Sequence, residues 1–145
     1  MKIGIIGTGY VGLPTGVGFA ELGNKVVCID KDEVKIKALK AGKLTIFEDG
    51  LETLFQQNVR DGRLGFTSST AEGVKEADVV LIAVGTPPDP VTKEADLHYI
   101  YSAAAELAPH LTGYTVIATK STVPVGTGDE VEKIIRKNNP HAEFD

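Results

Sequence analysis

Short apolar runs alternate with amphipathic stretches along this chain, beginning at its first residues. Apolar runs typical of buried strands occupy Lys2–Ile6, Lys25–Ile29, Arg63–Thr67, Asp78–Val84 and Tyr114–Thr119. Between them, apolar residues recur at helical spacing and predict helices over Tyr10–Leu22, Asp32–Lys40, Leu51–Val59, Thr70–Glu76, Leu97–Ala108 and Thr127–Lys137. Strands that alternate with helices through short turns are typical of α/β domains with a mostly parallel sheet. We therefore expect a doubly wound sheet with helices on both faces.

The spacing also predicts which helical residues face the core. The expected core positions in the second and third helices are Val34, Ala38, Leu39, Leu51, Leu54, Phe55 and Val59. A proline-rich loop is expected over Gly85–Asp96, and residues 141–145 resemble the approach to a sixth strand. Because a domain seldom ends at such a point, we expect residues 1–145 to be one domain from a truncated N-terminal fragment.

Composition and charge narrow the classes of function. The chain has 145 residues, 42% of them hydrophobic, and a formal net charge of −5. This charge argues against general binding of nucleic acid or acidic membranes, and the longest apolar runs are strand-length. Met1 leads directly into the first strand without a signal peptide, and Cys28 is the single cysteine. We expect a cytoplasmic protein in which Cys28 is a small core residue.

A glycine-rich loop carries the first chemical signal. Gly7, Gly9 and Gly12 fit the pattern G-x-G-x-x-G directly after a strand and before a helix. The first glycine permits the tight turn, the second lets the backbone approach a pyrophosphate, and the third allows close packing of helix on strand. Backbone N–H groups at the helix N-terminus favour a negative charge there. A tight turn without a ligand is the alternative, but the strand–loop–helix–strand context favours a Rossmann-type dinucleotide site.

Asp30 stands at the end of the second strand, where a carboxylate accepts hydrogen bonds from the adenosine ribose of a dinucleotide. A carboxylate there repels the 2′-phosphate of NADP, so the sequence favours NAD. Lys31 and Lys35 are close in sequence and could soften that repulsion. The charge of Asp30 therefore favours NAD, but the two lysines leave the choice between NAD and NADP open.

Two further segments bring hydroxyl groups to the carboxyl edge of the predicted sheet, where open α/β sheets bind ligands. Thr86 follows the central strand, and Ser121 and Thr122 follow the fifth strand. Thr127 and Glu130 have the spacing of a capping box at the last helix. The cap accounts for Thr127 but not for the run Lys120-Ser121-Thr122-Val123-Pro124 that precedes it.

Taken together, these motifs resemble the UDP-glucose/GDP-mannose dehydrogenase family. The matching segments are Gly7–Leu13, Asp30, Glu48 with Gly50-Leu51, Val84–Pro87, Ala95–Leu97 and Lys120–Gly126. They span essentially the whole chain in the family's order, and the similarity is greatest to members that oxidise UDP-glucose. One departure is Asp49, where the family usually has proline. That substitution puts the shape of this turn in doubt.

The resemblance implies a function for the full-length protein. It implies oxidation of the C6 alcohol of UDP-glucose to UDP-glucuronate with two NAD, through a thioester on a cysteine. It implies that Gly7, Gly9, Tyr10, Val11 and Gly12 hold the pyrophosphate, that Asp30 and Lys35 lie at the ribose, and that Thr86, Ser121 and Thr122 line the cofactor site. Thr122 would also help to hold the water or polar network used in oxidation and hydrolysis.

The resemblance also implies what the chain lacks. The family's nucleophilic cysteine, catalytic lysine and asparagine, and most of its nucleotide-sugar site belong to later domains, so we expect this chain alone to be inactive. A homo-oligomer is expected for the full-length protein. No metal site is predicted, since His98, His110 and His141 lack ligand spacing.

Three alternatives remain open on the sequence. The sugar could be that of GDP-mannose or UDP-N-acetylmannosamine, because the discriminating pocket lies elsewhere. The chain could belong to a different NAD-dependent alcohol or hydroxyacid dehydrogenase, with Lys120 and Ser121 catalytic. It could also be a non-catalytic regulatory domain that senses NAD, a reading disfavoured by the run Lys120–Pro124.

Overall fold

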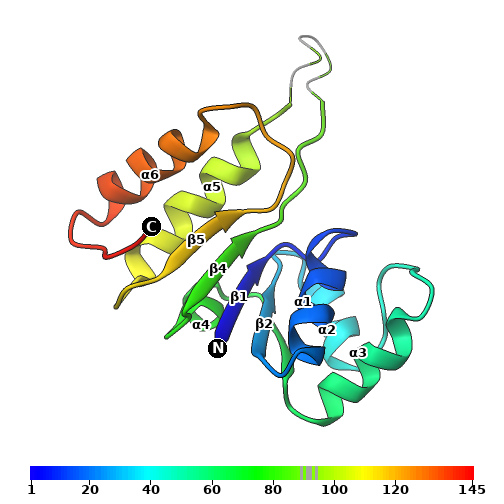
Figure 1. Cartoon of the computed structure of the whole chain (residues 1–145). Coiled ribbons are helices and arrows are strands. Elements are labelled where there is room, and N and C mark those ends of the chain that lie inside the picture. Colours follow the sequence, from blue (N-terminus) through cyan, green and yellow to red (C-terminus); the bar gives the residue numbers. More distant parts are fainter. Residues whose placement is uncertain (89, 91–92, 94) are drawn as a thin grey trace.

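The computed structural model describes residues 1–88, 90, 93 and 95–145 (Figure 1). One sheet is formed by β1 (Lys2–Ile6), β2 (Lys25–Ile29), β3 (Leu64–Thr67), β4 (Val79–Ile82) and β5 (Val116–Thr119). The strands lie in the order β3-β2-β1-β4-β5, and each neighbouring pair is parallel. The chain reverses its direction of travel across the sheet between β1 and β4, which is where doubly wound sheets bind ligands. The predicted fold class is confirmed.

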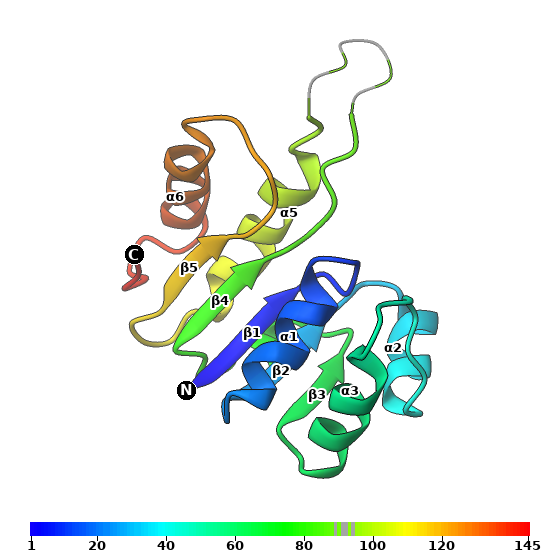
Figure 2. The same cartoon turned by 45° about the vertical axis from the view of Figure 1, so that its right-hand side comes forward.

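Helices cover both faces of the sheet. They are α1 (Gly12–Glu21), α2 (Glu33–Lys40), α3 (Leu51–Arg60), α4 (Thr70–Val74), α5 (His98–Leu107) and α6 (Thr127–Asn138), with a 3₁₀ turn η1 (Ala108–His110) after α5. Figures 1 and 2 show α1, α2 and α3 on one face and α5 and α6 on the other. In the predicted loop Gly85–Asp96, Pro88 and Ala95 form an antiparallel bridge, while residues 89, 91, 92 and 94 lie outside the described residues.

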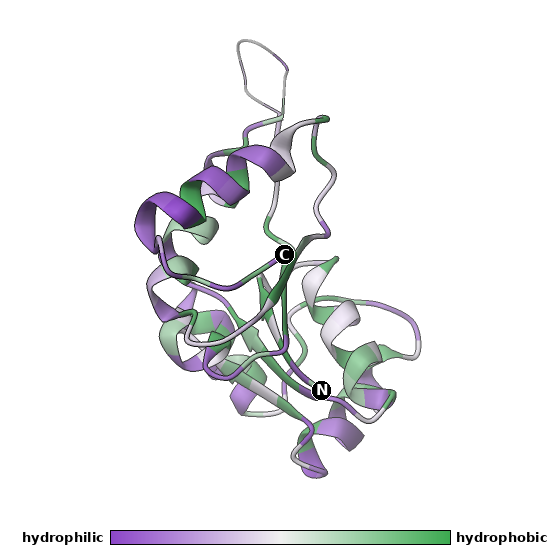
Figure 3. Ribbon diagram, turned by 60° about the vertical axis from the view of Figure 1, so that its left-hand side comes forward, coloured by the Kyte–Doolittle hydropathy of each residue, from purple (hydrophilic) through white to green (hydrophobic). Residues whose placement is uncertain are grey.

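Two apolar clusters, one on each face, hold these layers together. The cluster beneath α1, α2 and α3 contains Ile5, Leu13, Val17, Cys28, Leu39 and Phe55, all fully buried. The opposite cluster joins Val80 and Ile82 of β4 to Ile100 and Leu107 of α5 and Ile135 of α6. Figure 3 shows the strands mostly hydrophobic and α6 largely hydrophilic. Burial of apolar surface on both faces is therefore what fixes the sheet between its helices.

Cys28 has the structural position that the sequence predicts. The residue is fully buried in β2, and a Cβ atom on Gly16 would lie 2.5 Å from its Sγ atom. The missing side chain at Gly16 thus lets α1 pack directly on the cysteine. Burial raises the pKa of the Cys28 thiol to about 12, so the group is a neutral part of the core.

Two of the predicted core positions are wrong. Val34 is 80% exposed and Leu54 is 36% exposed, whereas Ile36, Leu39 and Phe55 are buried. Asp32 caps α2 by accepting hydrogen bonds from the backbone N–H groups of Val34 and Lys35. Because Val34 stands two residues, or about 200° of helical rotation, from Ile36, it faces outward when Ile36 faces the core.

The predicted capping box at α6 is also wrong. Gly126, with a φ of 89°, is the N-cap residue, and no side chain caps the helix. The Thr127 hydroxyl instead donates to the carbonyl oxygen of Pro124 at 2.8 Å. The left-handed backbone at Gly126 turns the chain into α6 one residue earlier than a Thr127 cap requires.

The prediction for the C-terminal residues agrees with the structure, since Phe144 forms a parallel bridge with Thr115 beside β5.

Candidate functional site: the carboxyl edge of the sheet

The loop after β1 is shaped by two glycines that the fold itself requires. Gly7 has a φ of 107°, and a Cβ atom there would lie 2.5 Å from the carbonyl oxygen of Ala83. A Cβ atom on Gly12 would collide with the carbonyl oxygen of Gly7. The loop therefore returns on itself so closely that α1 begins directly above the end of β1. Helix α1 begins at Gly12, with Val11 as its N-cap, so Tyr10 and Val11 belong to the loop and not to the predicted helix.

Gly9 differs from Gly7 and Gly12, because neither its backbone conformation nor its neighbours in the fold require glycine at this position. A Cβ atom on Gly9 would meet no atom within 4 Å, and the residue does not have a positive φ. Within the described part of the chain, the backbone N–H groups of Gly9, Tyr10, Val11 and Gly12 have no hydrogen-bond acceptor. Open space beside unpaired N–H groups at a helix N-terminus suits an anionic group that approaches the backbone closely.

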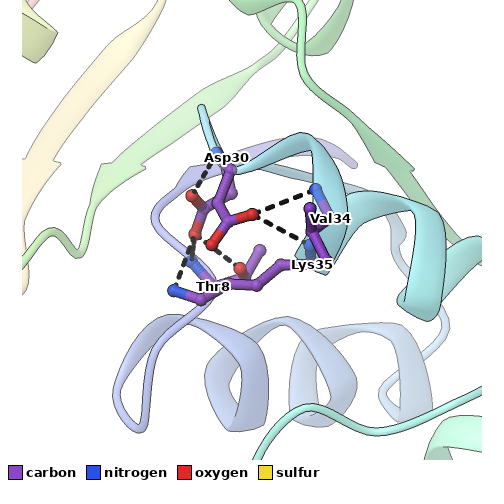
Figure 4. A network of polar contacts seen from close by, with 5 residues as sticks. Thr8, Asp30, Val34 and Lys35 are labelled. Carbon is purple, nitrogen blue, oxygen red and sulfur yellow. Dashed lines mark hydrogen bonds and ion pairs between the residues drawn. The ribbon is translucent and has the colours of Figure 1, made fainter.

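Asp30, at the end of β2, is bonded to this loop (Figure 4). Its Oδ2 atom accepts hydrogen bonds from the Thr8 hydroxyl at 2.6 Å and the Thr8 backbone N–H at 2.9 Å. Its Oδ1 atom accepts one from the backbone N–H of Asp32 at 3.0 Å. The Nζ atom of Lys35 lies 3.9 Å from Oδ2. The carboxylate is therefore fixed in orientation from three segments.

These contacts set the charge of Asp30. Burial alone would raise its pKa, but the hydrogen bonds from Thr8 and Asp32 and the positive charge of Lys35 bring the pKa below its ordinary value. The side chain remains 17% exposed. Asp30 is thus a fixed anion at neutral pH with capacity left to accept a hydrogen bond from a hydroxyl group.

A cavity of about 460 Å³ opens beside the loop and Asp30. Of the residues predicted from the sequence, Gly7, Gly9, Asp30 and Lys35 line it. Gly12 is buried beneath the loop, and Tyr10 and Val11 are exposed at its outer side, at 69% and 46%. The structure brings the glycine loop and the acidic residue together, as the sequence predicts.

Several lining residues were missed by the sequence analysis. Thr70, Tyr99, Ser102 and Glu106 form the wall of the cavity on the side of α4 and α5, next to Lys31, which the sequence had placed near Asp30. Tyr99, Ser102 and Glu106 lie on the helix after the central strand, and their spacing of three and four residues could have indicated a shared helix face. Nothing in the sequence indicates that this face looks toward Asp30.

Thr86, Ser121 and Thr122 gather at the same edge of the sheet but outside the lining of this cavity. The Thr86 hydroxyl donates to the carbonyl oxygen of Thr122 at 3.3 Å. The Ser121 hydroxyl donates to the carbonyl oxygen of Val84 at 2.6 Å. These bonds tie the segment after β4 to the segment after β5, so the three hydroxyl residues lie together as a second polar group along the edge.

This arrangement fits a dinucleotide. The loop offers N–H groups and open space for a pyrophosphate, Asp30 offers a fixed acceptor for ribose hydroxyls, and the cavity between them is of the size that holds small ligands.

No described helix is long and apolar enough to span a bilayer. Among the described residues, no three His, Cys, Asp or Glu side chains are grouped to hold a metal ion.

Comparison with known proteins gives the family. Residues 1–145 match the sequence model of the UDP-glucose/GDP-mannose dehydrogenase family, NAD binding domain. The chain is 59% identical over 143 residues to UDP-glucose 6-dehydrogenase of Rhizobium meliloti (strain 1021), a match that covers 99% of this chain and 33% of that protein. It therefore spans about a third of the length of this relative.

Solved structures agree. The fold matches a UDP-glucose dehydrogenase from Pyrobaculum islandicum with a TM-score of 0.93 and 36% identity, over 99% of this chain and 34% of that one. It matches GDP-mannose dehydrogenase from Pseudomonas aeruginosa, solved as a ternary complex, with a TM-score of 0.95 and 32% identity, over 100% and 35%. The chain belongs to the UDP-glucose/GDP-mannose dehydrogenase family, and its 145 residues are the family's NAD-binding domain.

Proposed function

We propose that this chain is the NAD-binding domain of a UDP-glucose 6-dehydrogenase. The whole enzyme would oxidise the C6 alcohol of UDP-glucose to the carboxylate of UDP-glucuronate, using two NAD. The observation that carries this proposal is the similarity of nearly the whole chain to the Rhizobium meliloti enzyme, which exceeds its similarity to the GDP-mannose dehydrogenase.

In this proposal the carboxyl edge of the sheet holds the cofactor. The N–H groups of Gly9, Tyr10, Val11 and Gly12 receive the pyrophosphate, with Gly7 shaping the turn. Asp30 accepts hydrogen bonds from the adenosine ribose, and Lys35, 3.9 Å from that carboxylate, lies at its rim. The unpaired N–H groups and the empty space at Gly9 support this assignment.

Thr86, Ser121 and Thr122 would line the other end of the cofactor. The hydrogen bonds from Thr86 to Thr122 and from Ser121 to Val84 hold the segments after β4 and β5 at a fixed spacing. Thr122 is the one of the three whose side chain we assign to the water or polar network of the oxidation and hydrolysis steps. NAD, when bound, supplies the acceptor for the hydride that leaves C6.

The nucleophile is assigned to a part of the enzyme beyond this chain. Cys28 is fully buried in β2, and the pKa of its thiol is raised to about 12, so it cannot reach or attack an aldehyde. We therefore propose that residues 1–145 are an N-terminal fragment that binds NAD and catalyses nothing alone. For the full-length protein we propose a homo-oligomer in the cytoplasm.

The test is NADH formation from UDP-glucose, measured at 340 nm for this chain and for the longer protein that contains it. We expect no turnover by the chain and two NADH per UDP-glucose for the longer protein. Turnover by the chain alone would overturn the assignment of the nucleophile to a later domain. GDP-mannose and UDP-N-acetylmannosamine serve as competing substrates, and preference for either would replace UDP-glucose in the proposal.

A further inference from the structure

Glu106 on α5 holds Lys31 against the wall of the cavity. The Lys31 Nζ atom lies 2.6 Å from the Oε2 atom of Glu106. The other carboxylate oxygen, Oε1, accepts a hydrogen bond of 2.6 Å from the hydroxyl of Thr70, a residue only 7% exposed. Glu106 is thus held from α4 as well as by Lys31, which lowers the cost of ordering its own side chain in the ion pair.

The charges around the cavity come in two pairs. Asp30 faces Lys35 across 3.9 Å, and Glu106 faces Lys31 across 2.6 Å, and all four residues line the cavity. The hydrogen bonds from Lys31 and Thr70 bring the pKa of Glu106 below its ordinary value, so its carboxylate is charged at neutral pH. The lining residues therefore carry no net charge from these four groups, and Lys31, whose side chain is 69% exposed, is paired with Glu106.

Lys31 immediately follows Asp30, so its side chain starts beside the carboxylate that we assign to the adenosine ribose. NADP differs from NAD by a phosphate on the 2′-hydroxyl of that ribose, and this phosphate carries close to two negative charges. A lysine free to turn toward the ribose would attract the phosphate. The pair with Glu106 directs Lys31 to α5 instead.

We propose that Glu106 is a positioning residue for cofactor specificity, which favours NAD over NADP by keeping Lys31 paired and away from the ribose. This inference rests on the proposed function, because it requires the adenosine ribose to lie at Asp30. Glu106 acts through Lys31, and the anchor at Thr70 keeps the carboxylate in place. Discrimination then depends on three residues beyond Asp30, namely Lys31 after β2, Thr70 on α4 and Glu106 on α5.

The experiment measures the dissociation constants of NAD and NADP by isothermal titration calorimetry for the wild-type chain and the Glu106→Gln variant. Glutamine keeps the shape and can still accept the Thr70 hydrogen bond, but it loses the charge that holds Lys31. We expect the ratio of the NADP constant to the NAD constant to fall about threefold to fivefold, mainly through tighter NADP binding. Glu132→Gln, which breaks an exposed ion pair with Arg136 on α6, is the matched control and should leave the ratio unchanged.

The same substitution in a Lys31→Met background tests whether Glu106 acts on the NADP-to-NAD ratio through Lys31. In Lys31→Met, adding Glu106→Gln should change the ratio by less than about twofold, since no lysine is left to release. An equal change in both backgrounds would mean that the Glu106 charge acts directly on the phosphate, which overturns a role through Lys31. An unchanged ratio in Glu106→Gln itself, with NAD still bound, would also overturn the inference. Failure of the wild-type chain to bind NAD would instead contradict the proposed function.

Discussion

The hydroxyl of Thr8 donates a 2.6 Å hydrogen bond to the Oδ2 atom of Asp30, and so ties the glycine loop after β1 to the end of β2. The backbone N–H of Thr8 donates to the same oxygen at 2.9 Å. Thr8 is fully buried within the loop, and it lines the cavity together with Asp30. The position of the loop and the orientation of the carboxylate therefore depend on each other.

Replacing Thr8 by valine should weaken both the fold and the site. The variant removes one hydrogen bond to a charged acceptor while nearly keeping the side-chain volume, which costs about 1.5–3 kcal/mol of unfolding free energy. Thr8→Ser keeps the hydroxyl and should lose less. Urea denaturation measures both, and equal stability of the valine and serine variants would contradict the importance of this bond.

Asp30→Asn should show a stability loss that depends on pH. The native pKa of Asp30 is below its ordinary value, so the charged form stabilises the folded state above the unfolded pKa of about 4. That contribution disappears as pH falls through the lower native pKa. We expect the variant to be about 1–2 kcal/mol less stable at pH 7, and the difference to shrink steadily in denaturation series taken below pH 4. A difference that is constant with pH would contradict the account.

Gly12→Ala should disrupt the start of α1, because the new Cβ atom would collide with the carbonyl oxygen of Gly7. Overpacking of this kind costs about 1–3 kcal/mol or more. The matched control is Gly18→Ala on the exposed side of the same helix, where a Cβ atom meets nothing within 4 Å. That control should gain about 0.5–1 kcal/mol. Thermal denaturation of the two variants should give shifts of opposite sign.

Cys28 should resist thiol reagents in the folded chain. Its side chain is fully buried, and the pKa of its thiol is raised to about 12 by that burial. We expect Ellman's reagent to react with the thiol only as fast as the chain unfolds, and rapidly in denaturant. Rapid labelling under native conditions would show that the residue reaches solvent and would reopen the question of a catalytic role.

The sequence predicts the strands well because their signal is local. Apolar runs such as Lys2–Ile6 and Lys25–Ile29 are buried on both faces, and their limits agree with β1 and β2. The glycine spacing likewise predicts the loop, since a Cβ atom on Gly12 would collide with the nearby Gly7, although the contact that requires Gly7 is with the distant Ala83 after β4. Asp30 is predicted by its place at the end of a strand.

The failures involve choices that tertiary structure makes. Val34 and Ile36 both have helical spacing to other apolar residues of α2, but they lie on opposite faces of the helix. Packing against the sheet buries the face with Ile36. Thr127 and Glu130 have the spacing of a capping box, but Gly126, in the left-handed conformation, is the N-cap residue of α6. The pair of Lys31 with Glu106 joins residues far apart in the chain, and no local pattern marks it.

Gly9 gives the most direct test that this loop is the pyrophosphate site. Since the fold leaves open space at its Cβ position, Gly9→Ala should keep the unfolding free energy within about 1 kcal/mol of wild type. The decisive measurement is a calorimetric titration of both chains with NAD. We predict saturable binding of one NAD per wild-type chain, and a loss of at least about tenfold in affinity, or 1.4 kcal/mol, for the alanine variant. Equal affinity of the two folded chains, or no binding by the wild type, would contradict the account.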